Sequence, residues 1–199
     1  MSQARVLSER ELKQVLNYCS TQPHANRNRC MMLLSHLSGM RVGTIAKLTI
    51  ENVLNSDGTI KDEIRLLPHQ VKGNKHITVF VSKKLREELR TYLQIRFGIK
   101  DLLAVTLTDT SRALFPTQKN PNRGFTANTL CQLFGKIYSD CHLDGASSHS
   151  GRRFFISKLA DRGVGVHVLM SLANHTNIST TQRYISQNPT IMKAAVELL

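Results

Sequence analysis

Strand-forming runs in this sequence are confined to one short stretch. The runs Glu63–Leu67 and His76–Val81 are rich in β-branched and apolar residues, and residues 72–75 (KGNK) predict a turn between them. These two runs predict a small antiparallel sheet and no more. We therefore expect a mainly α fold with a small antiparallel β-sheet, in the α+β class.

Most of the remaining sequence has helical spacing with recognisable ends. Ser8 and Glu11 form a capping box at the start of the first helix, and Gly39 stops the second. Ser82 and Thr126 are the expected N-caps of two further helices. Eight helices are expected in chain order. The first follows Ser8, the second covers 26–38, the third runs from Ser82 to before Gly98, and the fourth begins near Thr126. The last four cover 149–161, 166–173, 179–185 and the stretch from Pro189 to Leu199.

The length of the chain and its loops indicate one domain. A chain of 199 residues is long enough for a single well-buried core. The segment Thr117–Gly124 is basic and polar, which is typical of a surface loop rather than a domain boundary. We expect a single domain over residues 1–199.

The cysteines and the N-terminus indicate the compartment. The four cysteines form no CxxC pair and no zinc-type spacing with histidine, which predicts free thiols in a reducing cytoplasm and no metal site. The N-terminal residues lack the apolar core of a signal peptide, and no run is long enough to span a membrane. We expect a cytoplasmic protein, near the nucleoid if bacterial, with no membrane partner.

The charge balance favours a polyanionic partner. Lys and Arg number 27 against 14 acidic residues, which gives a formal net charge of +13 and a pI near 10.0. Basic side chains set against phosphates release counterions, so this surplus favours binding to DNA or RNA. A basic surface that is merely solvated is the alternative.

Arg41 and Lys72 are the first two candidates for chemistry. Arg41 follows the helix-stopping Gly39 and precedes a short helix, so a rigid scaffold would hold its fork of donors, which suits a phosphate. Lys72 lies in the expected turn, from which a mobile ammonium can enter a groove and donate a proton. Lys75 competes for the same task. The ordinary alternatives are a surface ion pair for the arginine and an exposed turn for the lysines.

A second group of candidates lies at the helix start HSGRR. His149 and Arg152 are three residues apart and share one face of the helix, where free amide donors suit an anion. Apolar residues such as Phe154 hold the opposite face in the core, and Arg153 should point away from Arg152. A structural histidine at a basic helix start would explain the same pattern.

The last candidates are His175 and Tyr184. His175 follows a short apolar helix, and Tyr184 comes nine residues later on a polar helix that begins near Ser179. The neighbours of Tyr184 in sequence are polar, which argues against a purely buried role. A tyrosine that packs on one face of a short helix with its hydroxyl in water is the alternative.

Together these residues resemble the catalytic domain of the tyrosine recombinases, the phage integrase family. That family carries Arg, Lys, His-x-x-Arg, His or Trp, and Tyr in this order, and the resemblance runs from about residue 5 to 190. It implies six catalytic residues: Arg41, Lys72, His149, Arg152, His175 and Tyr184. The sequence departs from the family pattern at Thr44, where an acidic residue is common, at Asn174, where glycine is frequent, and in HSGRR, where HxLRH is usual.

The resemblance also implies a reaction. Arg41 and Arg152 would hold the scissile phosphate, and Tyr184 would attack it to form a 3′-phosphotyrosyl link. Lys72 would protonate the leaving 5′-oxygen, and the two histidines would assist in proton transfer and in bonding the phosphate. No cofactor and no metal are implied.

Partners and assembly follow from the same resemblance. The implied partner is double-stranded DNA, with a homotetramer on paired sites and possible monomers without DNA. Family members often carry an N-terminal helical DNA-clamping domain, and this sequence has no room for one. Apolar residues within 189–199 would dock on a neighbouring subunit or fold back onto their own core. Basic residues that we expect to contact the DNA backbone are Lys75, Lys119, Arg123, Arg153, Lys158 and Arg183.

Three other functions fit part of the pattern. A type IB topoisomerase-like enzyme shares the Arg-Lys-Arg-His-Tyr set and would relax supercoils as a monomer. A non-catalytic DNA-binding protein on the same fold would fit the departures at Thr44 and Asn174. A basic RNA-binding protein fits the charge but not the five ordered anchors.

Overall fold

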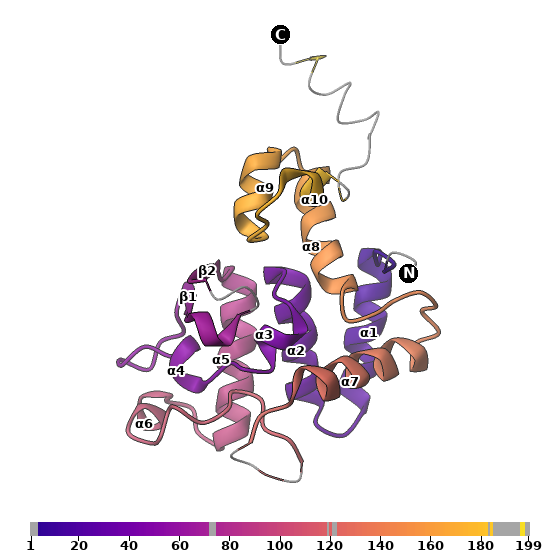
Figure 1. Cartoon of the computed structure of the whole chain (residues 1–199). Helices are drawn as coiled ribbons and strands as arrows, with labels where there is room; N and C mark the ends of the chain where they lie inside the picture. The colour runs from indigo at the N-terminus through magenta and orange to yellow at the C-terminus, as the bar shows by residue number, and fades with distance from the viewer. Residues whose placement is uncertain are drawn as a thin grey trace.

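The computed structural model of the chain describes residues 4–71, 75–118, 120, 123–182, 184 and 196–197. Figure 1 shows a helical body that includes the N-terminus, with α8 leading away from it to α9 and α10. The helices are α1 (Glu9–Thr21), α2 (Ala25–Ser38), α3 (Val42–Ile45), α4 (Ile50–Val53), α5 (Lys83–Phe97), α6 (Leu103–Thr106), α7 (Ala127–Asp140), α8 (Ser150–Asp161), α9 (Val166–Leu172) and α10 (Ile178–Gln182), and the strands are β1 (Glu63–Leu66) and β2 (Ile77–Phe80).

The first two helices begin and end where local chemistry requires. The Ser8 hydroxyl accepts a hydrogen bond from the Glu11 N–H at 3.2 Å, and the Glu11 carboxylate accepts one from the Ser8 N–H at 2.8 Å, which completes the expected capping box. Gly39 ends α2 with φ +67°. A Cβ at this position would lie 2.6 Å from the Phe155 ring, so glycine is required by both conformation and space.

The two other long helices of the body also follow their predicted caps. The Ser82 hydroxyl accepts from the Leu85 N–H, and Gly98 ends α5 in the left-handed conformation. The Thr126 hydroxyl accepts from the Thr129 N–H at 3.1 Å and begins α7. The predicted helices over these regions are confirmed.

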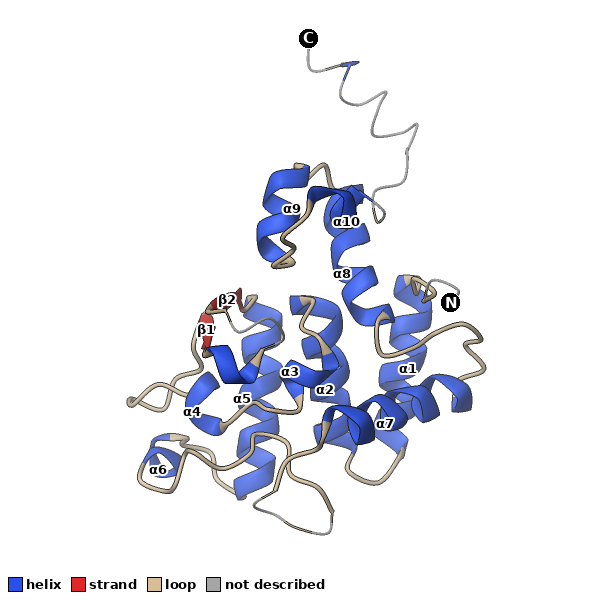
Figure 2. Ribbon diagram, viewed as in Figure 1, coloured by secondary structure: helices blue, strands red, loops and turns tan. Residues whose placement is uncertain are grey.

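β1 and β2 form the small antiparallel sheet that the sequence predicts (Figure 2). Glu63 pairs with Phe80 and Leu66 pairs with Ile77. The connection between the strands begins with a 3-10 helix, Pro68–Gln70, which the sequence analysis did not predict. The buried Gln70 side chain donates to the Asn52 side-chain oxygen at 2.8 Å, so the base of this connection is anchored on α4.

The centre of the body is α2, against which α8 packs closely. Most side chains of α2 are buried, including Met31, Met32, Leu33 and Leu34. A Cβ on Gly151 of α8 would lie 2.2 Å from the Ser35 hydroxyl oxygen of α2. The absence of a side chain at this position therefore allows α8 to approach α2 along its first turn.

The segment formed by α9 and α10 is small and shallowly buried. Its buried residues are Leu169, Ala173 and Thr181. Of the predicted C-terminal helix, the structure describes Val196 and Glu197, and the rest of 189–199 lies outside the described residues. Within the described part of the chain, no helix combines the length and apolar character needed to span a bilayer.

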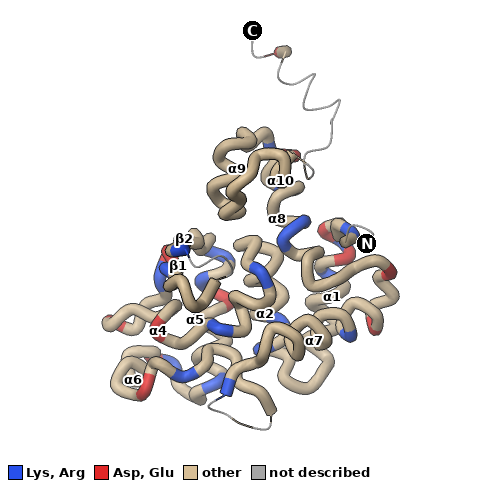
Figure 3. The backbone as a smooth tube through the Cα atoms, viewed as in Figure 1, with Lys and Arg blue, Asp and Glu red and all other residues tan. Residues whose placement is uncertain are grey.

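Lysines and arginines are distributed over many elements of the described chain rather than gathered on one (Figure 3). Blue segments mark the start of α8 and the end of α2 near α3, and α8 meets α2 there. The fold prediction, mainly α with a small antiparallel sheet, is confirmed.

Candidate active site

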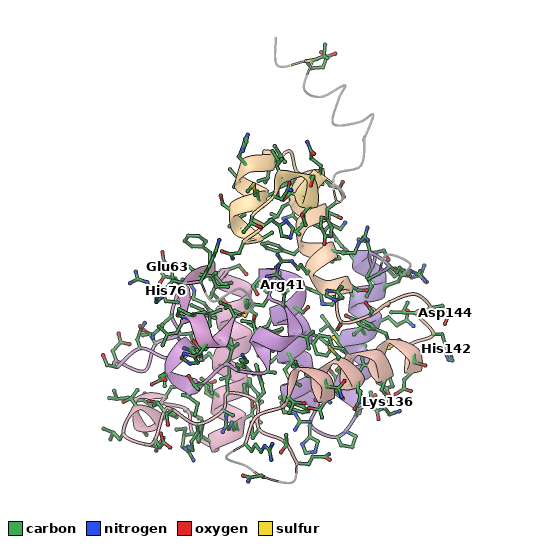
Figure 4. All side chains as sticks on the ribbon, viewed as in Figure 1. Arg41, Glu63, His76, Lys136, His142 and Asp144 are labelled. Carbon is green, nitrogen blue, oxygen red and sulfur yellow. The ribbon has the colours of Figure 1, made fainter. Side chains whose placement is uncertain are left out.

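Arg41 stands at the N-cap of α3, directly after α2 ends. Its backbone is extended, and its carbonyl accepts hydrogen bonds from the N–H groups of Thr44 at 2.9 Å and Ile45 at 3.0 Å. Met40 and Val42, on either side, are buried in the core. Figure 4 shows Arg41 near the centre of the molecule, where α2 ends beneath α8. The side chain is therefore carried by a firmly packed backbone, as the sequence predicts.

Arg152 lies in the first turn of α8 and is 7% exposed. Its guanidinium donates to the Gly39 carbonyl at 2.9 Å and to the Ala173 carbonyl. The first carbonyl closes α2 just before Arg41, and the second closes α9 just before His175. A single buried side chain thus joins the three segments that carry the candidate residues. Among the described residues, these bonds use two of the five N–H donors of the guanidinium.

Arg41 and Arg152 lie close enough to influence each other. Burial, followed by the charge of Arg41, lowers the pKa of Arg152 to about 10. Among the ion pairs of the described residues, neither arginine has a carboxylate partner. Two cations that are adjacent and partly desolvated favour an anion between them, and a phosphate accepts the bidentate bonds that guanidinium groups donate.

His175 is placed beside these arginines by the end of α9. Its N–H donates to the Met170 carbonyl at 3.0 Å, and its ring Nδ1 is hydrogen-bonded to the buried Thr181 hydroxyl at 2.9 Å. Burial, then the charges of Arg152 and Arg41, lower the pKa of His175 to about 4. The imidazole is therefore neutral near pH 7, with one ring nitrogen occupied by Thr181.

Asn174, the residue before His175, explains one departure from the family pattern. It adopts φ +50°, in the left-handed region that glycine adopts most readily. Asparagine is one of the few residues with a side chain that tolerates this conformation. Asn174 therefore keeps the turn that presents His175. Thr44, another departure, is buried within α3.

Tyr184 follows α10 and is partly exposed. Its N–H donates to the Thr181 carbonyl at 2.9 Å, and its carbonyl accepts from the Ser157 hydroxyl of α8 at 3.3 Å. Its ring stacks on the imidazole of His175, with centroids 5.8 Å apart and planes at 22°. Tyr184 also influences the pKa of Arg152, so its phenol lies within electrostatic range of that guanidinium. The structure thus brings together Arg41, Arg152, His175 and Tyr184.

The two other predicted catalytic residues are His149 and Lys72. His149 is the exposed N-cap residue of α8, and its N–H donates to the Ser147 hydroxyl at 3.3 Å. It precedes Arg152 by three residues, on the same helix start. Lys72 lies outside the described residues, although the preceding Val71 is buried.

The predicted DNA contacts fall in different places. Lys75 and Arg123 are exposed. Lys158 instead pairs with Glu9 of α1 at 3.1 Å. The guanidinium carbon of Arg153 lies 5.3 Å from the centre of the Tyr184 ring, so this side chain turns toward the candidate nucleophile. Lys119 and Arg183 lie outside the described residues.

Sequence reasoning missed three groups that hold the site in place. They are the Thr181 hydroxyl, the Ser157 hydroxyl and the two helix-ending carbonyls that Arg152 binds. The only signal for any of them was Gly39, which marks the end of α2. The Thr181 side chain could not be assigned because its role depends on how α10 packs against the end of α9, where His175 lies.

A family model for the phage integrase family matches residues 5–190 of this sequence. The chain belongs to the phage integrase family. The tyrosine recombinase XerD of Rickettsia prowazekii is 28% identical over 198 residues, which cover 96% of this chain and 61% of that protein. XerA of Pyrococcus horikoshii is 28% identical over 193 residues, which cover 96% of this chain and 60% of that protein. The chain thus spans about 60% of the length of these relatives.

Solved structures agree with the fold. The crystal structure of XerA recombinase matches with a TM-score of 0.74 at 20% identity, over 100% of this chain and 66% of that one. The catalytic domain of bacteriophage HP1 integrase matches with a TM-score of 0.64 at 18% identity, over 98% of this chain and 95% of that one. XerH site-specific recombinase, solved with palindromic difH substrate, matches with a TM-score of 0.70 at 19% identity, over 98% of this chain and 53% of that one. The predicted tyrosine recombinase catalytic-domain fold is confirmed.

Proposed function

We propose that this chain is a site-specific DNA recombinase that breaks and rejoins double-stranded DNA through a 3′-phosphotyrosyl intermediate. The observation that carries the proposal is the convergence of Arg41, Arg152, His175 and Tyr184, which are far apart in sequence. The partner is proposed from this site, from the surplus of basic residues, and from the DNA-bound relative XerH. Such an enzyme would act where its DNA is held, at the nucleoid in a bacterium.

The two arginines would hold the phosphate. Arg41 and further donors of Arg152 would bond its non-bridging oxygens, whose negative charge grows in the pentacoordinate transition state. Because Arg152 is already fixed by two carbonyls, little reorganisation is needed when DNA binds.

Tyr184 would attack the phosphorus. The phenolic oxygen forms the new P–O bond as the bond to the 5′-oxygen breaks, and the phenol gives its proton to His149 or His175. Lys72 would give a proton to the departing 5′-oxygen. In the reverse step, a 5′-hydroxyl of a partner strand attacks the phosphotyrosine and releases Tyr184. One phosphoester is exchanged for another at each step, so the proposed reaction consumes no ATP and needs no cofactor or metal.

The DNA backbone would be contacted by basic residues of the surface. Exposed Lys75 and Arg123 are proposed for this role, with Lys119 and Arg183. Lys158 is the weakest of the predicted contacts, because its ammonium is engaged by Glu9. These contacts would set affinity and salt dependence rather than sequence preference.

Assembly would use the C-terminal segment. A groove of about 1130 Å³ lies between α1, α2, β2, α8 and α9, with apolar walls that include Phe80, Phe155 and Leu172. Phe80 is 58% exposed there. We propose that residues 189–199 of a neighbouring subunit occupy this groove in a tetramer on paired sites, with monomers in the absence of DNA. Folding back in the same chain is the alternative, and cross-linking from Val196 to the groove in mixed tagged subunits separates the two.

Capture of covalent adducts tests the proposed chemistry. A pool of nicked duplexes with random sequence is incubated with the protein, and DNA that stays attached under denaturing conditions is recovered and sequenced. The wild type should retain DNA, and Tyr184→Phe should retain none. Tyr18→Phe is the matched control, because Tyr18 bonds Asp140 far from this site and should leave capture unchanged.

Three outcomes would count against the proposal. Capture that persists in Tyr184→Phe would mean that another residue is the nucleophile. Duplex binding without any adduct in the wild type would mean a DNA-binding protein without cleavage. Relaxation of a supercoiled plasmid by the monomer, without exchange between paired sites, would assign a topoisomerase activity instead.

A further inference from the structure

Arg153 of α8 contacts the ring of Tyr184, although it follows Arg152 directly in sequence. Its guanidinium carbon lies 5.3 Å from the ring centre. A guanidinium over an aromatic face is attracted by the ring quadrupole, and the attraction is stronger where both groups are partly shielded from water. Arg153 and Tyr184 are each partly buried. We propose that Arg153 is a positioning residue that sets the orientation of the nucleophile, an inference that rests on the proposed function.

A second contact from the same helix supports this role. Ser157 is four residues after Arg153, so the two side chains share one face of α8. The Ser157 hydroxyl donates to the Tyr184 carbonyl at 3.3 Å, while Arg153 lies over the ring. One helix face therefore holds Tyr184 by both its backbone and its side chain.

Tyr184 needs such support because its own element is weak. It follows α10, which has five residues, and short isolated helices are marginal in water. Among the described residues, the ring also stacks on the imidazole of His175, which belongs to the same small segment. Arg153 is thus the ring contact that comes from the helix carrying Arg152.

The consequence is a fixed relation between phosphate and nucleophile. Arg152 would hold the phosphate and Arg153 holds the attacking ring, and the two residues are adjacent in the first turns of α8. The contact between Arg153 and the ring would then resist any shift of α10 relative to α8 that moves the phenolic oxygen out of line with the phosphorus. Loss of Arg153 should leave DNA binding intact and reduce the fraction of complexes in which Tyr184 is aligned, by about tenfold.

Fluorine NMR tests the contact without DNA. The chain has four tyrosines, so 3-fluorotyrosine labelling gives four resonances, and Tyr184→Phe identifies one of them. Arg153→Gln should shift the Tyr184 resonance and leave the other three in place. Arg90→Gln, which removes an exposed arginine from α5, is the matched control and should shift none. An unmoved Tyr184 resonance in Arg153→Gln would overturn the proposal.

Single-turnover cleavage of a captured nicked duplex tests the consequence. Arg153→Gln should form adduct about tenfold more slowly at saturating DNA, with duplex affinity within about twofold of the wild type. Arg153→Lys keeps the cation and should recover part of the rate. A weaker affinity with a smaller salt dependence, and an unchanged rate at saturation, would make Arg153 a phosphate contact instead. If the wild type forms no adduct, the proposed function fails while the NMR result still decides the contact.

Discussion

Arg41 and Arg152 lie where the buried helix α2 meets α8, whereas His175 and Tyr184 lie on the shallow segment after α8. The first pair is carried by residues packed among the core side chains of α2 and α3. The second pair depends on a few polar contacts, chiefly Thr181 to His175 and Ser157 to Tyr184. The half that we propose to bind the phosphate is thus built into the core, and the half that carries the proposed nucleophile is attached to it.

This difference fits the chemistry that we propose. Charge stabilisation requires donors that do not move when the transition state forms. The nucleophile must form a bond to DNA and later release it, which a lightly held segment permits. The comparison therefore predicts that changes in the first half affect both the reaction and the stability of the whole body, whereas changes in the packing of the second half affect stability only locally.

Among the changes that test this comparison, the largest effect is expected for Arg152→Lys. An ammonium group has three donors on one atom and cannot bond two separate carbonyls and a phosphate together. Adduct formation should fall by about 100- to 1,000-fold, and the free energy of unfolding should fall by about 1–3 kcal/mol because a buried carbonyl loses its partner. Single-turnover cleavage and urea denaturation measure the two effects.

Arg29→Lys is the matched control for this change. Arg29 makes a two-pronged bond to Glu88 at 3.1 and 2.6 Å, remote from the candidate site. The same loss of a fork should leave the rate of adduct formation near that of the wild type. If Arg152→Lys forms adduct at the wild-type rate, the two bonds from Arg152 to carbonyls do not contribute to adduct formation.

The next effect concerns acid stability and the buried His36 of α2. Burial lowers the pKa of His36 to about 4, from an ordinary value of 6.5. Between these values the unfolded chain binds a proton that the folded chain does not, so stability is complete above about pH 6.5 and is lost as the pH falls toward 4. His36→Phe should remove up to about 3 kcal/mol of this pH dependence.

Urea denaturation between pH 7 and 4.5 measures this slope, the change in the free energy of unfolding with pH. Phe at this position can keep the edge-to-face contact with Phe154, whose ring centre is 5.4 Å from that of His36. His175 has a pKa lowered in the same direction, but it lies on the attached segment and is more exposed. Its contribution to global stability should be smaller. An unchanged slope in His36→Phe would place the acid sensitivity elsewhere.

The smallest effect is expected at Asn174. Ala at φ +50° should destabilise the turn by about 1 kcal/mol, whereas Gly should be neutral or slightly stabilising. Hydrogen exchange should show faster exchange in α9 and α10 for Asn174→Ala and little change in α2. Faster exchange across the whole body would mean that the segment and the body unfold as one unit.

Much of the helical body could be predicted from sequence, because its helices begin and end at local sequence signals. The capping box at Ser8, the stop at Gly39 and the caps Ser82 and Thr126 each act within one turn of the chain. The short helix α4 was missed because four residues give too little helical periodicity, although Thr49 and Asn52 cap it locally. A distant group also holds it, since the Ile50 N–H donates to the Arg112 carbonyl at 3.1 Å. No local pattern encodes such a contact.

Four of the candidate residues could be predicted, and the groups that support them could not. The order of Arg41, Arg152, His175 and Tyr184 followed a family pattern that can be read along the chain. The contact of Arg153 with Tyr184 could not be predicted, because helix spacing shows only that Arg153 points away from Arg152. Only the return of α10 onto α8 places Tyr184 within its reach.

The contact between Gly151 and Ser35 has a practical consequence for protein engineering. Chimeric recombinases are made by joining segments of related chains, and a junction between α2 and α8 would separate these two positions. A relative with a larger residue at the position of Gly151 would bring a side chain into the space of the Ser35 hydroxyl. Exchanges that include α8 should therefore carry the matching α2 residue with it.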